Sequence, residues 1–240
     1  IGNPNDSLII MLPGSFCPSS GLNYLYEKLK DDYCIVLVEY NGHYENSTFS
    51  SRQNEAKGIV EYIQKQNIHT IKMIYGQSMG AEIAIELFKQ LEKTNIDVDY
   101  CFLDGASCIK LPYLYKKFMY FKFNQILKMM KKTDVDQILN MKLIKKIARG
   151  NIENLRPMIE PMAVTAQFLS KESVKNETEC CYTFDFPLFD KEAQNKMYFF
   201  YGKEEKAYKT CYRGVKKAYP QSNSIFKEGY GHLWTFNVFY

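Results

Sequence analysis

The sequence predicts an α/β protein with a mostly parallel six-stranded sheet, helices on both faces of the sheet, and an α-helical segment inserted after the fourth strand. Two observations support this fold class. Short runs of consecutive apolar residues alternate with segments of helical spacing, which is typical of strands buried on both faces of a parallel sheet. The alternation stops between residues 106 and 193, where the charge balance also changes.

Six apolar runs are expected to form the strands, at residues 7–12, 33–38, 71–75, 99–104, 196–201 and 224–227. Helices are expected between them at residues 21–30, 51–66, 81–88 and 205–218. Ser19 or Ser20 is expected to cap the first of these helices. Because the carboxyl ends of parallel strands share one edge of the sheet, we expect functional groups in the loops that follow them.

The interrupting segment is expected to be a helical cap, with helices near residues 112–131, 134–148, 153–158 and 161–170. The expected organisation is therefore a core domain of residues 1–105 and 194–240 with a cap domain of residues 106–193. Residues 1–105 carry 8 basic and 14 acidic side chains, whereas residues 106–175 carry 14 and 5. A shift of this size indicates a separate structural unit.

The basic cap has three interpretations. The favoured one is a solvated lysine-rich face above an apolar face that packs on the core. The second is a face that binds a membrane surface or anionic lipid, and the third is attraction of an anionic substrate. No nucleic-acid-binding pattern accompanies the charge, so nucleic acid is not an expected partner.

Length and composition indicate a globular protein and give no sign of a membrane span. A chain of 240 residues that is 46% hydrophobic can bury a full core. No apolar run approaches the about 20 residues that span a bilayer. No signal peptide is visible either, so we expect a cytoplasmic protein, although the chain begins at Ile1 rather than methionine.

The seven cysteines lack regular spacing and are expected to be reduced and mostly buried. The three histidines form no metal-ligand pattern, so neither a metal nor a cofactor is expected. Nothing in the sequence indicates an oligomeric state.

The most informative motif is Gly76-Gln77-Ser78-Met79-Gly80, which lies between a predicted strand and a predicted helix. So tight a strand-to-helix turn forces its central serine into a strained backbone conformation, with the hydroxyl projecting above the sheet. Glycines on both sides allow strand and helix to approach closely. Ser78 is therefore the candidate nucleophile. The Met79 N–H at the helix start is a candidate oxyanion donor.

A serine nucleophile needs a base, and the base needs an acid to orient it. His232 is the best candidate base, because it follows the last predicted strand within a glycine-containing loop. His69 lies at the opposite edge of the sheet, and His43 lies in a turn that is more typical of a structural residue.

The acid is expected after a strand between the serine and the histidine. Glu205, three residues after Gly202, is favoured, with Glu204 and Asp104 as alternatives. A second oxyanion donor is expected in the loop after the first strand, where the Ser15 N–H is favoured and Phe16 is the alternative. Pro13 has no N–H to offer.

Together, these residues resemble the α/β-hydrolase superfamily. The resemblance rests on the elbow around Ser78, on Pro13-Gly14-Ser15 after the first strand, on the turn Asn41-Gly42-His43, and on the order serine, acid, histidine. It spans residues 6–104 and 196–240 and implies a Ser78–His232–Glu205 triad with Met79 and Ser15 as oxyanion donors. The sequence departs from the family pattern in three places. Pro-Gly stands where His-Gly is frequent, the acid is glutamate, and the first antiparallel strands are missing.

The expected function is a serine hydrolase that acts on a small-molecule carboxylic ester or thioester. Two alternatives stay open: an acyltransferase that uses the same triad, and a non-catalytic ligand-binding protein on the same fold.

Overall fold

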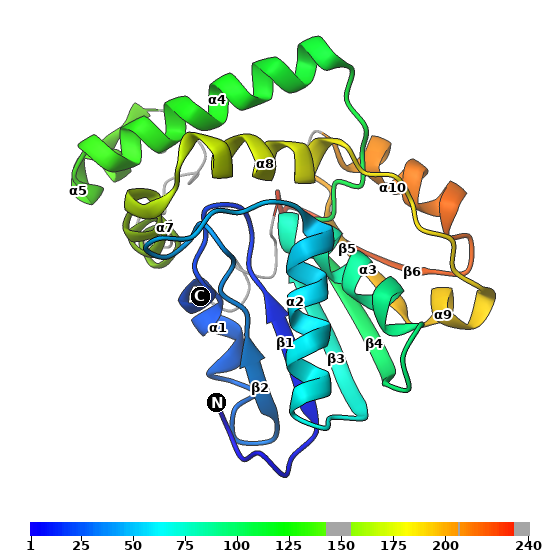
Figure 1. Cartoon of the computed structure of the whole chain (residues 1–240). Coiled ribbons are helices and arrows are strands. Elements are labelled where there is room, and N and C mark those ends of the chain that lie inside the picture. Colours follow the sequence, from blue (N-terminus) through cyan, green and yellow to red (C-terminus); the bar gives the residue numbers. More distant parts are fainter. Residues whose placement is uncertain (143–154, 206, 233–240) are drawn as a thin grey trace.

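A computed structural model describes residues 1–142, 155–205 and 207–232 of the chain. Six parallel strands form one sheet in the order β2-β1-β3-β4-β5-β6 (Figure 1). This arrangement confirms the predicted parallel α/β sheet. The strands are β1 (Leu8–Leu12), β2 (Cys34–Leu37), β3 (Thr70–Gln77), β4 (Asp97–Asp104), β5 (Met197–Gly202) and β6 (Asn223–Lys227).

The parallel register brings the strand ends that carry candidate residues to one edge of the sheet. Leu12 at the end of β1 pairs with Gly76 of β3, and Gln77 pairs with Asp104 at the end of β4. Gly202 at the end of β5 pairs with Lys227 at the end of β6. The loops after β1, β3, β5 and β6 therefore emerge at the same edge of the sheet.

Successive residues of a strand point to opposite sides, so the sheet contributes to an apolar cluster on each of its faces. Leu8, Ile10 and Leu12 of β1 enter one apolar cluster, whereas Ile9 and Met11 enter another. The first cluster packs under α2 (Arg52–Lys65), α3 (Met79–Leu91) and α10 (Tyr208–Ala218). The second packs under the 3-10 helix η1 (Ser19–Leu22) and α1 (Asn23–Tyr26).

In the described part of the segment between β4 and β5, four helices lie above the carboxyl edge of the sheet (Figure 1). We call them the upper helices: α4 (Tyr113–Lys132), α5 (Val135–Asn140), α7 (Arg156–Phe168) and α8 (Lys171–Tyr182). A short helix, α9 (Lys191–Asn195), then leads into β5. The upper helices have an apolar cluster of their own, and Phe16 from the loop after β1 is buried in it.

The upper helices differ in detail from the prediction. Among the described residues, a single helix, α7, runs through most of the two helices expected at residues 153–158 and 161–170, and it holds Pro161 in its interior. Residues 153 and 154 of the first expected helix lie outside the described residues. Proline lacks an N–H, so α7 gives up one backbone hydrogen bond there without ending. Helix α5 ends at Asn140, because Met141 is extended; residues 143–148 of that expected helix lie outside the described residues.

Helix α8 was not expected at all. Its buried face includes Ser173, Glu177 and Thr178, so it lacks the apolar stripe that predicts a helix. Its start is nevertheless well formed, since the Ser170 side chain accepts a hydrogen bond from the Ser173 N–H at 2.9 Å.

Two smaller helices were predicted too long. Residues 21–30 form only η1 and α1, and the helix expected from residue 205 starts at Tyr208.

Six of the seven cysteines are buried, as predicted. In the described ranges, none of the helices combines the length and apolar character needed to cross a bilayer.

Candidate active site

Ser78 lies at the apex of the turn between β3 and α3. Its φ of 52° and ψ of −119° are strained for a residue with a side chain. Tight packing holds the turn: a Cβ on Gly76 would lie 2.3 Å from the Gly80 carbonyl oxygen, and one on Gly80 would lie 2.3 Å from that of Leu12. Only glycine fits at these two positions, because the elbow packs closely on itself and on the end of β1.

Backbone and carboxylate hydrogen bonds tie the elbow to the end of β4. The Ser78 N–H donates to the Asp104 carbonyl at 2.7 Å. Glu82, one turn into α3, is buried and accepts hydrogen bonds from the amides of Ser107 and Cys108, both at 2.9 Å. Burial raises the pKa of Glu82 to about 7, although the two amides favour its charged form. Glu82 thus fixes the loop after β4 against the elbow helix.

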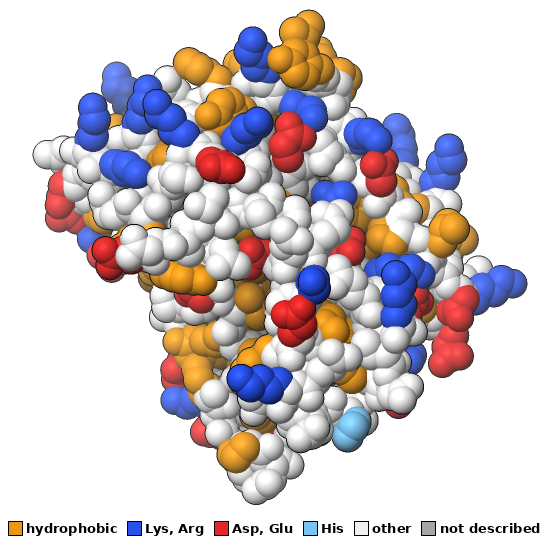
Figure 2. Space-filling model, in the orientation of Figure 1, with side chains coloured by type: hydrophobic (Ala, Val, Ile, Leu, Met, Phe, Trp, Pro, Cys, Tyr) orange, Lys and Arg blue, Asp and Glu red, His pale blue; other side chains and the backbone are white. Residues whose placement is uncertain are grey.

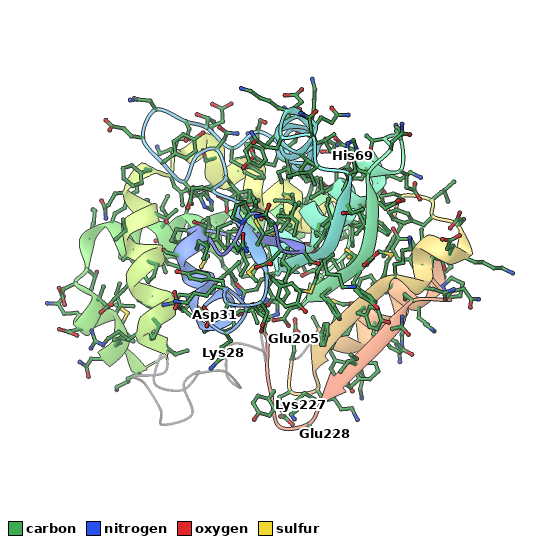
Figure 3. The ribbon with its side chains drawn as sticks, turned by 90° about the horizontal axis from the view of Figure 1, so that it is seen from below. Lys28, Asp31, His69, Glu205, Lys227 and Glu228 are labelled. Carbon is green, nitrogen blue, oxygen red and sulfur yellow. The ribbon has the colours of Figure 1, made fainter. Side chains whose placement is uncertain are left out.

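His232 reaches the elbow from the loop after β6. Its Nε2 lies 3.2 Å from Ser78 Oγ, and its Nδ1 lies 3.1 Å from Glu205 Oε1. The hydrogen-bonded order is therefore hydroxyl, imidazole, carboxylate. Glu205 belongs to the loop after β5 (Figure 3), and its carboxylate is largely shielded from solvent.

The loops that carry the acid and the base are attached to each other. The Lys203 N–H donates to the Lys227 carbonyl at 2.9 Å, and the Glu204 N–H donates to the Tyr230 carbonyl at 2.8 Å. A Cβ on Gly202 would lie 2.1 Å from the Gly231 carbonyl oxygen. Gly202 therefore lets the loop after β6 cross directly above β5, which delivers the imidazole to Glu205.

Opposing effects set the pKa of His232. The side chain is 38% exposed, so it is only partly removed from water. That partial removal lowers the pKa, whereas the hydrogen bond and charge of Glu205, followed by the charges of Asp104 and Glu82, raise it. The net effect is a pKa above the usual value. The carboxylates thus favour the imidazolium that a general base forms when it takes a proton.

The two alternative acids have other positions. Asp104 is completely buried at the end of β4, where its Oδ2 accepts a hydrogen bond from the Tyr75 hydroxyl at 3.2 Å. Glu204 is exposed, and its backbone N–H serves the loop contact with Tyr230. The carboxylate that is hydrogen-bonded to the imidazole is that of Glu205. His69 precedes β3 at the opposite edge of the sheet (Figure 3).

The loop after β1 lies against the elbow. A Cβ on Gly14 would stand 3.4 Å from Ser78 Cβ, so the next residue along the loop, Ser15, follows directly beside the nucleophile. The Met79 N–H opens α3, where helix amides lack a partner one turn back. Among the described residues the Ser15 N–H has no hydrogen-bond acceptor either. These two amides are the candidate oxyanion donors.

The Phe16 N–H, the alternative donor, is already engaged. It donates to Glu177 Oε2 of α8 at 3.2 Å, and Phe16 has a φ of 61°. The other carboxylate oxygen of Glu177 lies 2.9 Å from His43 Nε2. Both side chains of this pair are completely buried. Burial lowers the pKa of His43, but Glu177 and then Glu39 raise it to about 9 overall.

Sequence reasoning missed Glu82 and Glu177. Glu82 does leave a signal, since it is the only charged residue in the run 79–85. Glu177 leaves none, because α8 itself was not recognised. Within the part of the chain that the structure describes, no group of three or more His, Cys, Asp and Glu side chains could hold a metal ion.

Comparison with known proteins identifies the fold. The structure resembles MGS-M2, an alpha/beta hydrolase enzyme from a deep-sea metagenome library, with a TM-score of 0.70, 12% identity and coverage of 99% of this chain and 86% of that one. It also resembles a marine microorganism esterase (TM-score 0.67, 16% identity, 98% and 92% covered). A third similar structure is the carboxylesterase CesB from Bacillus subtilis (TM-score 0.61, 12% identity, 98% and 80% covered).

The chain therefore has the α/β-hydrolase fold, as the sequence predicts. No protein-family model and no curated protein sequence matches it.

Proposed function

We propose that the protein is a serine hydrolase that cleaves a small-molecule carboxylic ester or thioester through an acyl-enzyme intermediate. The observation that carries the proposal is the pair of contacts at His232, with Ser78 Oγ at 3.2 Å on one ring nitrogen and Glu205 Oε1 at 3.1 Å on the other. Three separate loops bring these groups together. The esterase and carboxylesterase neighbours support the same reaction class.

In the acylation step, Ser78 Oγ attacks the substrate carbonyl carbon while His232 Nε2 takes the hydroxyl proton. Glu205 accepts the Nδ1 proton in a hydrogen bond, so the imidazole presents its basic nitrogen to the serine. The Met79 and Ser15 amides donate to the oxyanion of the tetrahedral intermediate. The intermediate collapses when His232 passes the proton to the leaving alcohol or thiol.

In the second half-reaction, His232 removes a proton from water, which attacks the acyl-enzyme carbonyl. The same two amides stabilise the second oxyanion, and the acid product leaves as Ser78 recovers its proton. Transfer of the acyl group to another acceptor would use the same catalytic groups. Hydrolysis and acyl transfer therefore have to be distinguished by their products.

The upper helices, within residues 106–193, form the cap of this site in our proposal. Phe16 supports this role, because it belongs to the loop after β1 but is buried among the upper helices. Its ring contacts Phe123 of α4 edge-on, with centroids 5.1 Å apart. The cap therefore shares one apolar cluster with the loop after β1, which carries the Ser15 amide and which we call the oxyanion loop.

A fluorophosphonate probe tests the proposal, because it phosphonylates an activated serine. We expect native protein to be labelled on the peptide that contains Ser78 and heat-denatured protein to remain unlabelled. Ser78→Ala should abolish labelling, whereas the matched control Ser107→Ala, at the same edge of the sheet, should retain it. Labelling that is absent, or equal in Ser78→Ala, would overturn the assignment.

A series of p-nitrophenyl esters of increasing acyl length, with a matched thioester, then defines the substrate class. Product analysis with and without an added alcohol acceptor separates hydrolysis from acyl transfer.

The raised pKa of His232 predicts the pH dependence of activity. The imidazole must be neutral to accept the serine proton, so activity is lost as the pH falls through its pKa. We expect kcat/KM to decline on the acid side with a midpoint above the ordinary value of about 6.5. The residual activity of Glu205→Gln should decline at a lower pH, since the largest charge that raises the pKa is gone. A wild-type midpoint well below that value would contradict this assignment.

A further inference from the structure

Helix α4 carries apolar side chains on two opposite faces. One face packs into the cluster of the upper helices through Phe123, Leu127 and Met130. The opposite face, which we call the outer face of α4, carries large apolar side chains that are 52% to 74% exposed: Leu114, Phe118 and Phe121. Tyr113 and Tyr115, in the first turn of the helix, are exposed as well. A helix that only covers a core is polar on its outer side. The interpretation of the basic cap as a solvated lysine face therefore does not describe this surface.

The exposed apolar residues form a continuous stripe. Leu114, Phe118 and Phe121 have the spacing i, i+4, i+7, which places their side chains in one row along the helix. Figure 2 shows hydrophobic and basic side chains gathered along the top of the molecule, over α4. Exposed apolar patches of this kind mark interaction surfaces.

Lysines flank the stripe, and acidic residues are missing from it. Helix α4 has six lysines and no aspartate or glutamate. Helical geometry places the exposed Lys117 and Lys128 on one side of the stripe and Lys122 on the other. The Lys122 ammonium lies 4.6 Å from the centroid of the Phe118 ring. In the described ranges these three lysines lack an acidic partner, unlike Lys116, which pairs with Glu179 at 2.7 Å.

We infer that the outer face of α4 docks on an anionic lipid bilayer surface. An apolar and aromatic stripe between lysines matches such a surface, because the rings enter the headgroup region while the ammonium groups remain among the lipid phosphates. A second copy of this chain fits less well. Two-fold pairing through α4 would place lysines against lysines, with no acidic residue on the helix to compensate. This inference does not rest on the proposed hydrolase activity.

Co-sedimentation with vesicles tests the inference. We expect the protein to bind vesicles that contain phosphatidylglycerol and not vesicles of phosphatidylcholine alone, with binding that weakens as salt is added. Lys117→Gln/Lys122→Gln should lower the partition coefficient about 30-fold, the factor that two lysines near an anionic surface contribute. Phe118→Ser/Phe121→Ser should lower it at least about tenfold, because both rings leave the interface.

Matched variants on the opposite edge of the sheet control for charge and apolar content. Lys65→Gln/Lys93→Gln removes the same charge, and Tyr62→Ser removes an exposed ring; neither should change binding. All these positions are exposed, and unchanged melting temperatures will show that the variants fold. Failure to bind anionic vesicles, or binding that the α4 variants leave intact, overturns the inference. A concentration-dependent dimer that Phe118→Ser/Phe121→Ser abolishes, without vesicle binding, would assign the face to self-association instead.

Discussion

Glu205→Gln is expected to lower kcat by roughly 10³- to 10⁴-fold with little change in KM. In the proposed triad, Glu205 Oε1 holds the proton on His232 Nδ1, 3.1 Å away. A glutamine amide can turn its NH₂ toward Nδ1, which moves the imidazole proton to Nε2. A protonated Nε2 cannot accept the proton of Ser78. The measurement is steady-state hydrolysis of a p-nitrophenyl ester together with the melting temperature, because the fold should survive this near-isosteric change.

Asp104→Asn and Glu204→Gln are the matched controls for the acid. Glu204 is exposed, and its link to the loop after β6 runs through its backbone N–H, so its substitution should leave kcat within about threefold of wild type. Asp104 is buried and bonded to the Tyr75 hydroxyl, so Asp104→Asn should lower stability more than turnover. If Asp104→Asn instead caused the steep loss of kcat, the third member of the triad would lie at the end of β4.

The sequence predicted the parts of this fold that leave a short, contiguous pattern in the chain. The six strands are continuous apolar runs, and the elbow needs glycine at two positions where a Cβ would strike backbone 2.3 Å away. Ser78, Glu205 and His232 follow the same logic, because each comes just after a strand whose end lies at the shared edge. Chain order and one edge of a sheet were enough to bring these three together.

The parts that the sequence did not predict depend on contacts between distant segments. Helix α8 was not recognised, because the residues it buries include a serine, a threonine and Glu177. Glu177 meets His43, 134 residues away, and no local pattern indicates such a partner. The exposed apolar residues on the outer face of α4 were not predicted for a related reason: periodicity shows that a helix has apolar residues, but tertiary packing decides which of them are covered.

The loop after β1 and the proposed membrane-docking face lie on opposite sides of the upper helices. The inner side of the upper helices contacts the oxyanion loop at Phe16, through its ring to α4 and through its amide to α8. The outer face of α4 is exposed to solvent. The loop that positions the Ser15 amide is therefore held by the upper helices as well as by the sheet, so changes in their packing are expected to reach the proposed oxyanion site.

Glu177→Ala is expected to lower the free energy of unfolding by about 3 to 5 kcal/mol, the usual cost of breaking a buried ion pair. The change leaves His43 buried without its main partner and the Phe16 N–H without its acceptor. Activity should fall as well, by about 10²-fold in kcat, because a displaced Ser15 amide no longer meets the oxyanion. Urea unfolding and ester hydrolysis measure the two effects. Glu179→Gln, on the same helix but facing Lys116, should change stability by about 0.5 kcal/mol or less.

The pH dependence of stability separates this ion pair from simple loss of packing. The pKa of His43 is about 9 in the folded state, above the usual 6.5, so the pair stabilises the protein fully below pH 6.5. That stabilisation is lost as the pH rises toward 9, and its size is on the order of 3 kcal/mol. Glu39, 3.7 Å from His43 Nδ1, contributes a smaller part. Glu177→Gln keeps the side-chain volume but removes the charge, so its unfolding free energy should vary much less with pH than that of wild type over this range. Parallel pH profiles for the two proteins would show that packing, rather than charge, holds the upper helices to the oxyanion loop.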